Sequence, residues 1–145
     1  IGVHVSFLAD SENFNELNPG AFVTVSGFPE WKDRASGRPI LRSGILSSDP
    51  SYDYTGPTQD PGARRIAIEA FSYSGSSGSP VFALACGLKL GEGLTGGNLR
   101  AMRLIGVNAS SFLVRDNLSK QNGGIAYLFK SPIILDLVSE SAKHP

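Results

Sequence analysis

I-E-A-F-S-Y-S-G-S-S-G-S-P, at Ile68–Pro80, is followed directly by the apolar run Val81–Leu84. Strand-like sequence on both sides of the hexapeptide G-S-S-G-S-P (Gly75–Pro80) predicts a tight turn. Gly75 and Gly78 lack a Cβ and can adopt backbone angles that strain other residues. Flexible linkers and leftover tags have the same Gly/Ser composition. A linker, however, is expected in polar surroundings between domains, so the apolar flanks favour a functional turn.

Composition indicates one β-rich domain. The 145 residues include 17 Gly and 9 Pro but only 18% charged residues, a balance typical of short strands joined by turns. Thirteen Lys plus Arg balance thirteen Asp plus Glu, without a dense basic cluster, so we expect no nucleic-acid partner. No apolar stretch reaches the roughly 18 residues of a membrane span, so we expect no membrane partner either.

Metal and cofactor chemistry find no support in the sequence. Cys86 is the only cysteine, so no disulfide can form within the chain, and its apolar run Val81–Cys86 predicts a small buried side chain. His4 and His144 are far apart in the sequence and give no metal-ligand spacing. No phosphate-binding glycine loop occurs. We therefore expect neither a metal nor a cofactor.

Strand-like runs recur along the chain. In the first run, Ile1, Val3, Val5 and Phe7 alternate with polar or small residues, which predicts one buried strand face. A glycine at position 44 is typical of a β-bulge. Between the runs, Asp10–Gly20 and Asp49–Arg65 are polar, turn-rich loops, and Gly87–Leu99 is an extended connection. The predicted strands are Ile1–Leu8, Ala21–Phe28, Pro39–Ser47, Ile66–Phe71, Val81–Cys86, Met102–Asn108 and Gly124–Phe129.

The sequence after the last of these strands predicts a helix. Ser131 is expected as the N-cap and Pro132 at the first helical position, followed by apolar residues at helical spacing. Near-regular strands followed by one short helix favour an antiparallel barrel or sandwich over an alternating α/β fold.

Several segments resemble, in the same order, the second barrel of trypsin-like (chymotrypsin-fold) serine proteases, especially the disulfide-poor bacterial HtrA-type branch. The resemblance implies an all-β fold: a six-stranded antiparallel barrel with a short C-terminal helix. Residues 1–20 would be a lead-in strand and linker, 21–130 the barrel and 131–142 the helix, with the N-terminal barrel absent from this chain. The matching segments are F-V-T-V-S-G-F-P (Phe22–Pro29), S-G-I-L-S-S (Ser43–Ser48), Ile68–Pro80, I-G-V-N-A (Ile105–Ala109) and G-I-A-Y-L-F-K-S-P (Gly124–Pro132).

The resemblance implies catalytic roles at the hexapeptide. Ser77 would be the nucleophile, with the N–H groups of Gly75 and Ser77 stabilising the oxyanion. In the family, the general-base histidine and its orienting aspartate come from the first barrel and the inter-barrel region, so the resemblance implies that they would lie upstream of Ile1. We expect neither His4, on the polar side of the first run, nor His144, at the chain end, to replace that base. The implied activity is that of a serine endopeptidase, which cleaves a polypeptide through an acyl-enzyme intermediate. The resemblance also implies that this chain, as one half of such an enzyme, would be nearly inactive without the other barrel.

The same resemblance implies a substrate pocket walled by three segments. They hold no acidic residue, so we expect a small or apolar substrate side chain. For Phe71 and Tyr127, plain core packing is an equal alternative. Ser76 replaces the aspartate of the digestive enzymes, so activation by insertion of Ile1 is not expected. The pocket residues are Phe71, Ser72, Ser74, Asn108, Ala109, Ser110, Ile125, Ala126 and Tyr127.

Two other functions remain open at this point. The first is a noncatalytic protease homologue that keeps the barrel as a peptide-binding or interaction module. The second is a β-rich carbohydrate-binding or capsid-like domain in which G-S-S-G-S-P is coincidental. Under any of these functions, the sequence leaves a homo-oligomer open.

Overall fold

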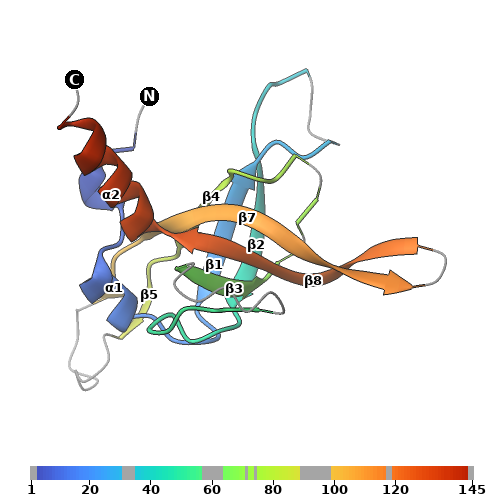
Figure 1. Ribbon diagram of the computed structural model, residues 1–145, viewed down its shortest axis with the longest axis horizontal. Coiled ribbons are helices and arrows are strands. Elements are labelled where there is room, and N and C mark those ends of the chain that lie inside the picture. Colours follow the sequence, from blue (N-terminus) through green and yellow to red (C-terminus); the bar gives the residue numbers. More distant parts are fainter. Residues whose placement is uncertain are drawn as a thin grey trace.

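The structure is a computed structural model that describes residues 3–30, 35–56, 64–70, 72–73, 75–88, 99–116 and 119–143. Six strands close into an antiparallel barrel in the order β1-β2-β3-β8-β7-β4 (Figure 1). The predicted all-β barrel is therefore confirmed. A separate two-stranded sheet pairs β5 (Cys86–Leu88) with β6 (Leu99–Arg100). The barrel strands are β1 (Phe22–Gly27), β2 (Ile40–Leu46), β3 (Arg65–Glu69), β4 (Pro80–Ala83), β7 (Arg103–Asp116) and β8 (Ser119–Lys130).

The barrel core contains the alternate residues that the strand pattern predicts. In β1, Val23 and Val25 are buried, while Phe22 on the opposite face is 60% exposed. Gly44 is not a bulge in the pairing of β1 with β2, because that register continues through Val23↔Gly44 without a shift. A Cβ at position 44 would instead collide with the Glu69 carbonyl oxygen. Glycine there allows β2 and β3 to approach closely.

β7 and β8 form a ribbon that is longer than the sequence predicted. They pair from Gly106↔Lys130 to Asp116↔Ser119, and the far end of the ribbon projects from the barrel (Figure 1). The predicted strands Met102–Asn108 and Gly124–Phe129 cover only the half of each strand that lies in the barrel. Polar residues make up most of the remaining positions, and pairing with the neighbouring strand supplies the structure there.

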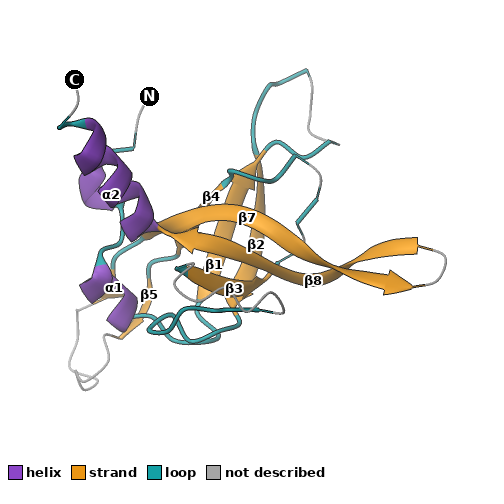
Figure 2. Cartoon of the chain, viewed as in Figure 1, coloured by secondary structure: helices purple, strands orange, loops and turns teal. Residues whose placement is uncertain are grey.

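Both α-helices lie on one side of the barrel (Figure 2). The predicted C-terminal helix is confirmed as α2 (Ser131–Ser141), which follows β8 directly. Ser131 is not its N-cap, however. Lys130 occupies that position without a side-chain capping bond, and the Ser131 hydroxyl donates to the Ala9 carbonyl oxygen at 2.5 Å. Ser131 therefore ties the helix to the segment before the barrel.

The predicted strand Ile1–Leu8 is wrong over its described part. Val5–Phe7 form the 3₁₀ helix η1, and only Leu8 makes a β-bridge, parallel to Leu104. Val3, Val5 and Phe7 are 54%, 52% and 41% exposed, so no buried face forms. An alternating pattern builds a strand only when an adjacent strand provides a hydrogen-bonding edge.

A helix replaces part of the loop expected at Asp10–Gly20. α1 (Ser11–Asn15) begins with a capping box: the Asp10 carboxylate accepts from the Asn13 N–H at 2.9 Å, and the Asn13 side chain accepts from the Asp10 N–H at 3.2 Å. Phe14 and Leu17 are buried in the core. The polar pattern that suggested a loop contains the helix-start signal itself.

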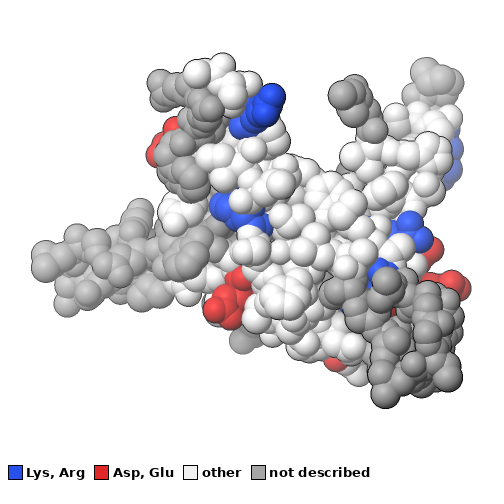
Figure 3. Space-filling view, turned by 180° about the vertical axis from the view of Figure 1, so that it is seen from behind, with Lys and Arg blue, Asp and Glu red and all other residues white. Residues whose placement is uncertain are grey.

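No described helix is both long and apolar enough to cross a membrane. On the face seen in Figure 3, charged side chains of the described residues lie in small groups separated by uncharged surface.

Candidate functional site

The hexapeptide forms a turn that ends at the first residue of β4; we call Gly75–Pro80 the Ser77 turn. Gly75 and Gly78 have φ angles of +84° and +80°, in the left-handed region that residues with a Cβ rarely adopt. A Cβ on Gly75 would also lie 2.9 Å from the Phe28 carbonyl oxygen, whereas a Cβ on Gly78 would meet nothing within 4 Å. Both glycines are therefore favoured by their backbone angles, and Gly75 is also required by its close approach to Phe28.

Backbone hydrogen bonds in this turn engage three amide N–H groups but not those of Gly75 and Ser77. The Ser76 N–H donates to Tyr73 O at 2.9 Å, and the Ser79 N–H donates to Ser76 O at 3.1 Å. The Gly78 N–H donates to Asn108 O at 2.7 Å. Within the described chain, the N–H groups of Gly75 and Ser77 donate to no acceptor. Both residues are exposed, whereas Ser76 and Ser79 are buried.

Asn108 on β7 anchors this turn from beneath. Its Nδ2 donates to Ser76 O at 2.9 Å and to Ser72 Oγ at 3.0 Å. Its backbone N–H donates to Ser79 O at 2.8 Å. Together with the bond from Gly78, these contacts fix the chain on both sides of Ser77. Asn108 is only 1% exposed, and its Oδ1 is buried without a hydrogen-bond partner among the described residues.

Buried serines lie on both sides of Ser77 in the turn. The Ser76 hydroxyl is fully buried and accepts from the Tyr73 N–H at 3.3 Å. A Cβ on Gly27 would collide with Ser79 Oγ and lie 3.7 Å from Nη2 of Arg42. Burial lowers the pKa of Arg42, and the nearby Tyr73 acts in the opposite direction. The G-F-P sequence that begins at Gly27, the last residue of β1, could have indicated a special role for this glycine, but the sequence did not predict the positions of Arg42 and Tyr73.

Only part of the predicted pocket meets the Ser77 turn. Ser72 and Asn108 are joined by the hydrogen bond described above, and Ala109 and Ser110 follow along β7, both half-buried. Phe71 and Ser74 lie outside the described residues.

The remaining predicted wall, Ile125–Tyr127, lies on β8. Tyr127 pairs with Ser110, so the wall reaches the turn through β7. Ala126 is completely buried in the core, whereas Ile125 is 39% exposed. The Tyr127 ring packs edge-on against Phe129 at 6.2 Å, with the Arg65 guanidinium carbon 5.0 Å from its centroid. Neighbouring residues of one strand face opposite sides, so Ile125 and Tyr127 lie on one face of β8 and Ala126 lies on the other.

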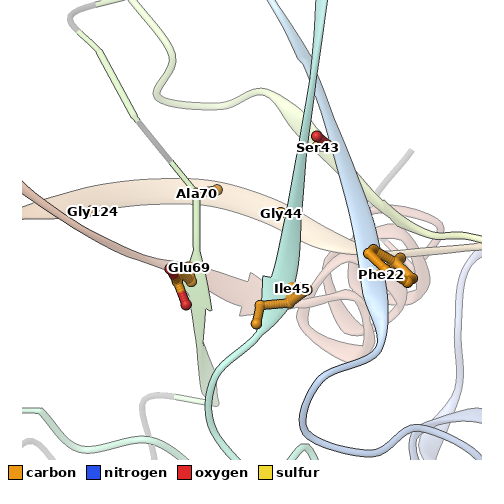
Figure 4. A pocket seen from close by; sticks show the side chains of 7 residues that line it. All are labelled: Phe22, Ser43, Gly44, Ile45, Glu69, Ala70 and Gly124. Atoms are coloured by element: carbon orange, nitrogen blue, oxygen red, sulfur yellow. The ribbon is translucent and has the colours of Figure 1, made fainter.

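Two pockets lie elsewhere on the described surface. One, of about 340 Å³, spans four neighbouring strands (Figure 4) and is lined by Phe22, Ser43, Gly44, Ile45, Glu69, Ala70 and Gly124. The other, of about 530 Å³, lies between α1, the loop around Ser51 and the start of α2. There, Lys130 Nζ forms an ion pair with Asp53 at 2.8 Å and donates a hydrogen bond to Tyr52 O at 3.0 Å. Both contacts hold this lysine within the fold. The sequence did not predict either pocket.

The described chain supplies no evident base for Ser77. His4 caps η1, where its Nδ1 lies 2.8 Å from Ser6 Oγ, and His144 lies outside the described residues. In the described part of the chain, no group of three or more His, Cys, Asp or Glu residues could hold a metal ion. Neither a scan of protein-family models nor a search of curated proteins finds a match to the sequence.

Proposed function

We propose that the chain is the nucleophile-bearing barrel of a trypsin-like serine endopeptidase, resembling the HtrA-type branch. One observation carries this proposal: in the Ser77 turn, the amides of Ser76, Gly78 and Ser79 are bonded, whereas those of Gly75 and Ser77, at an exposed serine, donate to no acceptor among the described residues. The Gly75 and Ser77 N–H groups are therefore the two donors that could stabilise an oxyanion. The left-handed glycines and the Asn108 contacts support a turn that holds its shape before substrate binds.

In the proposed reaction, Ser77 Oγ attacks the carbonyl carbon of a peptide bond while its proton passes to an imidazole base. The carbonyl oxygen becomes an oxyanion, which the Gly75 and Ser77 N–H groups stabilise. The C–N bond then breaks, the leaving amine takes the proton, and water hydrolyses the acyl-enzyme. Each oxyanion donor in such enzymes contributes about 2.7–4 kcal/mol of transition-state stabilisation.

The base would come from outside the described residues. The first barrel of the family supplies a histidine with an orienting aspartate, so this chain needs that barrel as its partner for full activity. Residues 21–130 would then be the second barrel, residues 131–142 its terminal helix, and a polypeptide the substrate. On its own, the chain should hydrolyse peptides barely above background.

A chemically rescued labelling reaction tests the proposal on the chain as it stands. A fluorophosphonate is added together with imidazole, which replaces the missing base: Ser77 Oγ displaces fluoride from phosphorus, and imidazole takes the proton. We expect mass spectrometry to locate the adduct on Ser77, at a rate that rises with imidazole concentration. Ser77→Ala should abolish the adduct, whereas Ser51→Ala, at an exposed loop serine, should not change it.

A different labelling pattern would reject the proposal. An adduct that persists in Ser77→Ala removes Ser77 from the chemistry. A folded chain that is not labelled at any imidazole concentration would favour the noncatalytic peptide-binding module. As a further control, the His4→Ala variant should be labelled at the same rate as the unsubstituted chain, because the His4 side chain caps η1 by accepting from the Ser6 N–H.

A further inference from the structure

The smaller of the two pockets lies where β3 ends in the barrel wall; we call it the Glu69 pocket. At this end, Glu69 pairs with Ile45 on β2, and the Ala70 N–H donates to Gly124 O on β8 at 3.0 Å. The volume of about 340 Å³ is near the lower end of the range for small-molecule sites, so the pocket fits one long side chain better than a larger ligand. The lining residues are Phe22, Ser43, Gly44, Ile45, Glu69, Ala70 and Gly124 (Figure 4).

The Glu69 pocket carries a carboxylate that the fold does not use. Glu69 is exposed, and among the described residues no side chain forms an ion pair or a hydrogen bond with its carboxylate. Arg65, the cation of the same strand, has its guanidinium carbon 5.0 Å from the centroid of the Tyr127 ring instead. The pocket therefore has a negative charge that is available to a ligand.

An apolar wall lies beside this carboxylate. Phe22, Ile45 and Glu69 are directly opposite one another on β1, β2 and β3. Directly opposite residues project from the same face of a sheet, so the three side chains form one row on the outside of the barrel. Phe22 is exposed and Ile45 is half-buried, so both offer apolar surface. A ligand that follows this row needs an apolar part next to a positive end, as a long basic side chain has.

The edge of β2 beside the pocket has main-chain groups without a partner strand. Residues 40–45 pair with β1, whereas only Ile45 and Leu46 pair with β3. The Leu46 N–H donates to Ala21 O at 2.9 Å, toward β1, so by strand alternation the main chain of Ser43 faces the opposite side. In the part of the chain that the structure describes, Ser43 has no main-chain partner on that side. Such an edge can pair with an extended peptide.

We propose that the Glu69 pocket binds a basic side chain, lysine or arginine, of an extended polypeptide. The aliphatic stem of that side chain packs against Phe22 and Ile45, and its cationic end pairs with the Glu69 carboxylate. The main chain of the same residue forms hydrogen bonds with Ser43 at the edge of β2. This assignment goes beyond the proposed protease function and does not depend on Ser77.

Other ligands fit these groups less well. An anion would be repelled by Glu69, and an uncharged apolar ligand would desolvate that carboxylate without pairing it. A metal ion needs several ligands, and the described residues contain no group of three or more His, Cys, Asp or Glu that could hold one. A free amine matches the carboxylate but lacks the amide groups that would pair with the β2 edge.

Capped amino acids test this inference by NMR titration of the full chain. N-acetyl-lysine N-methylamide is compared with its norleucine equivalent, which has the same four-carbon stem without the ammonium, and with pentylammonium, which has the ammonium without the amides. We expect the lysine probe to shift the amide signals of Ser43, Ile45 and Ala70. It should bind about threefold more tightly than pentylammonium, because only the lysine probe can bond the edge of β2.

Two variants at exposed positions separate the charge from the apolar wall. Glu69→Gln keeps the size of the side chain and removes its charge, so the lysine probe should bind about threefold more weakly, whereas the norleucine probe should not be weakened. Phe22→Ala removes apolar surface and should weaken both probes by a similar factor. Glu12→Gln, at an exposed glutamate on α1, is the matched control and should change neither affinity.

Several outcomes would overturn the inference. Lysine binding that Glu69→Gln does not weaken, or that Glu12→Gln weakens equally, removes the carboxylate from recognition. Pentylammonium that binds as tightly as the lysine probe assigns the pocket to free amines and rejects the polypeptide. Absence of any shift at the pocket amides up to about 100 mM probe rejects the site altogether. Fluorophosphonate labelling of Ser77 decides the protease function separately.

Discussion

The Ser77 turn and the lead-in segment (residues 3–15) were both predicted from local sequence patterns, yet only one has the predicted form. In the turn, Gly75 and Gly78 take left-handed angles, and Asn108 bonds the chain around Ser77. In the lead-in segment, the alternating residues Val3 and Val5 are exposed, and no strand forms. A glycine is needed because of the backbone angles at its own position, so it predicts local structure directly. An alternating pattern forms a strand only if another strand lies beside it, so it predicts local structure less directly.

The largest effect in the Ser77 turn is expected at Gly75, in contrast to the neighbouring Gly78. Both Gly75→Ala and Gly78→Ala place a Cβ at a left-handed position, which costs about 1 kcal/mol. Only Gly75→Ala also meets a backbone oxygen, that of Phe28. We expect urea unfolding to show a loss of about 3 kcal/mol for Gly75→Ala and about 1 kcal/mol for Gly78→Ala. Equal losses would show that the approach to Phe28 does not constrain the turn.

Asn108→Ala should give the next largest effect on the Ser77 turn. It removes both Nδ2 bonds and leaves the Ser76 carbonyl oxygen without that donor, although it also removes the unpaired Oδ1. We expect a net loss of about 2 kcal/mol in unfolding free energy, together with slower fluorophosphonate labelling of Ser77. Stability and labelling that both match the unsubstituted chain would contradict its role as an anchor.

These effects follow from contacts that the sequence predicts only in part. The turn was predictable because its glycines and its serine lie within six consecutive residues. The Ser72–Asn108 bond was not, since it joins residues 36 positions apart whose approach depends on barrel closure. Ala126 was expected beside Ile125 in one pocket wall, although it points into the core. The alternation of side chains along a strand could have predicted that Ala126 faces the opposite side from Ile125.

In the lead-in segment, the strongest local feature is the capping box of α1. Asp10→Ala removes the carboxylate that accepts from the Asn13 N–H, and we expect a loss of about 1 kcal/mol. Asp10→Asn, which keeps a side-chain oxygen at the cap, is the matched control and should retain most of the stability. A loss of similar size in both variants would mean that charge, rather than capping, matters at this position.

The smallest effect is expected at the exposed alternating residues. Val5→Ser changes a side chain that is 52% exposed and should cost less than about 0.5 kcal/mol. Val25→Ser, at a 2% exposed position of β1, loses a buried apolar group and buries a hydroxyl, so it should cost about 3 kcal/mol. Comparable losses at the two valines would indicate that the lead-in segment packs like a barrel strand.

Amide hydrogen exchange, measured residue by residue by NMR before and after phosphonylation of Ser77, tests the central claim most directly. In the unmodified chain, the Ser76, Gly78 and Ser79 amides should exchange slowly, whereas those of Gly75 and Ser77 should exchange fast. Once phosphorus is attached, its oxygen should accept from both fast amides and slow their exchange. Protection of Gly75 and Ser77 already in the unmodified chain, or no change on phosphonylation, would contradict a preformed oxyanion site.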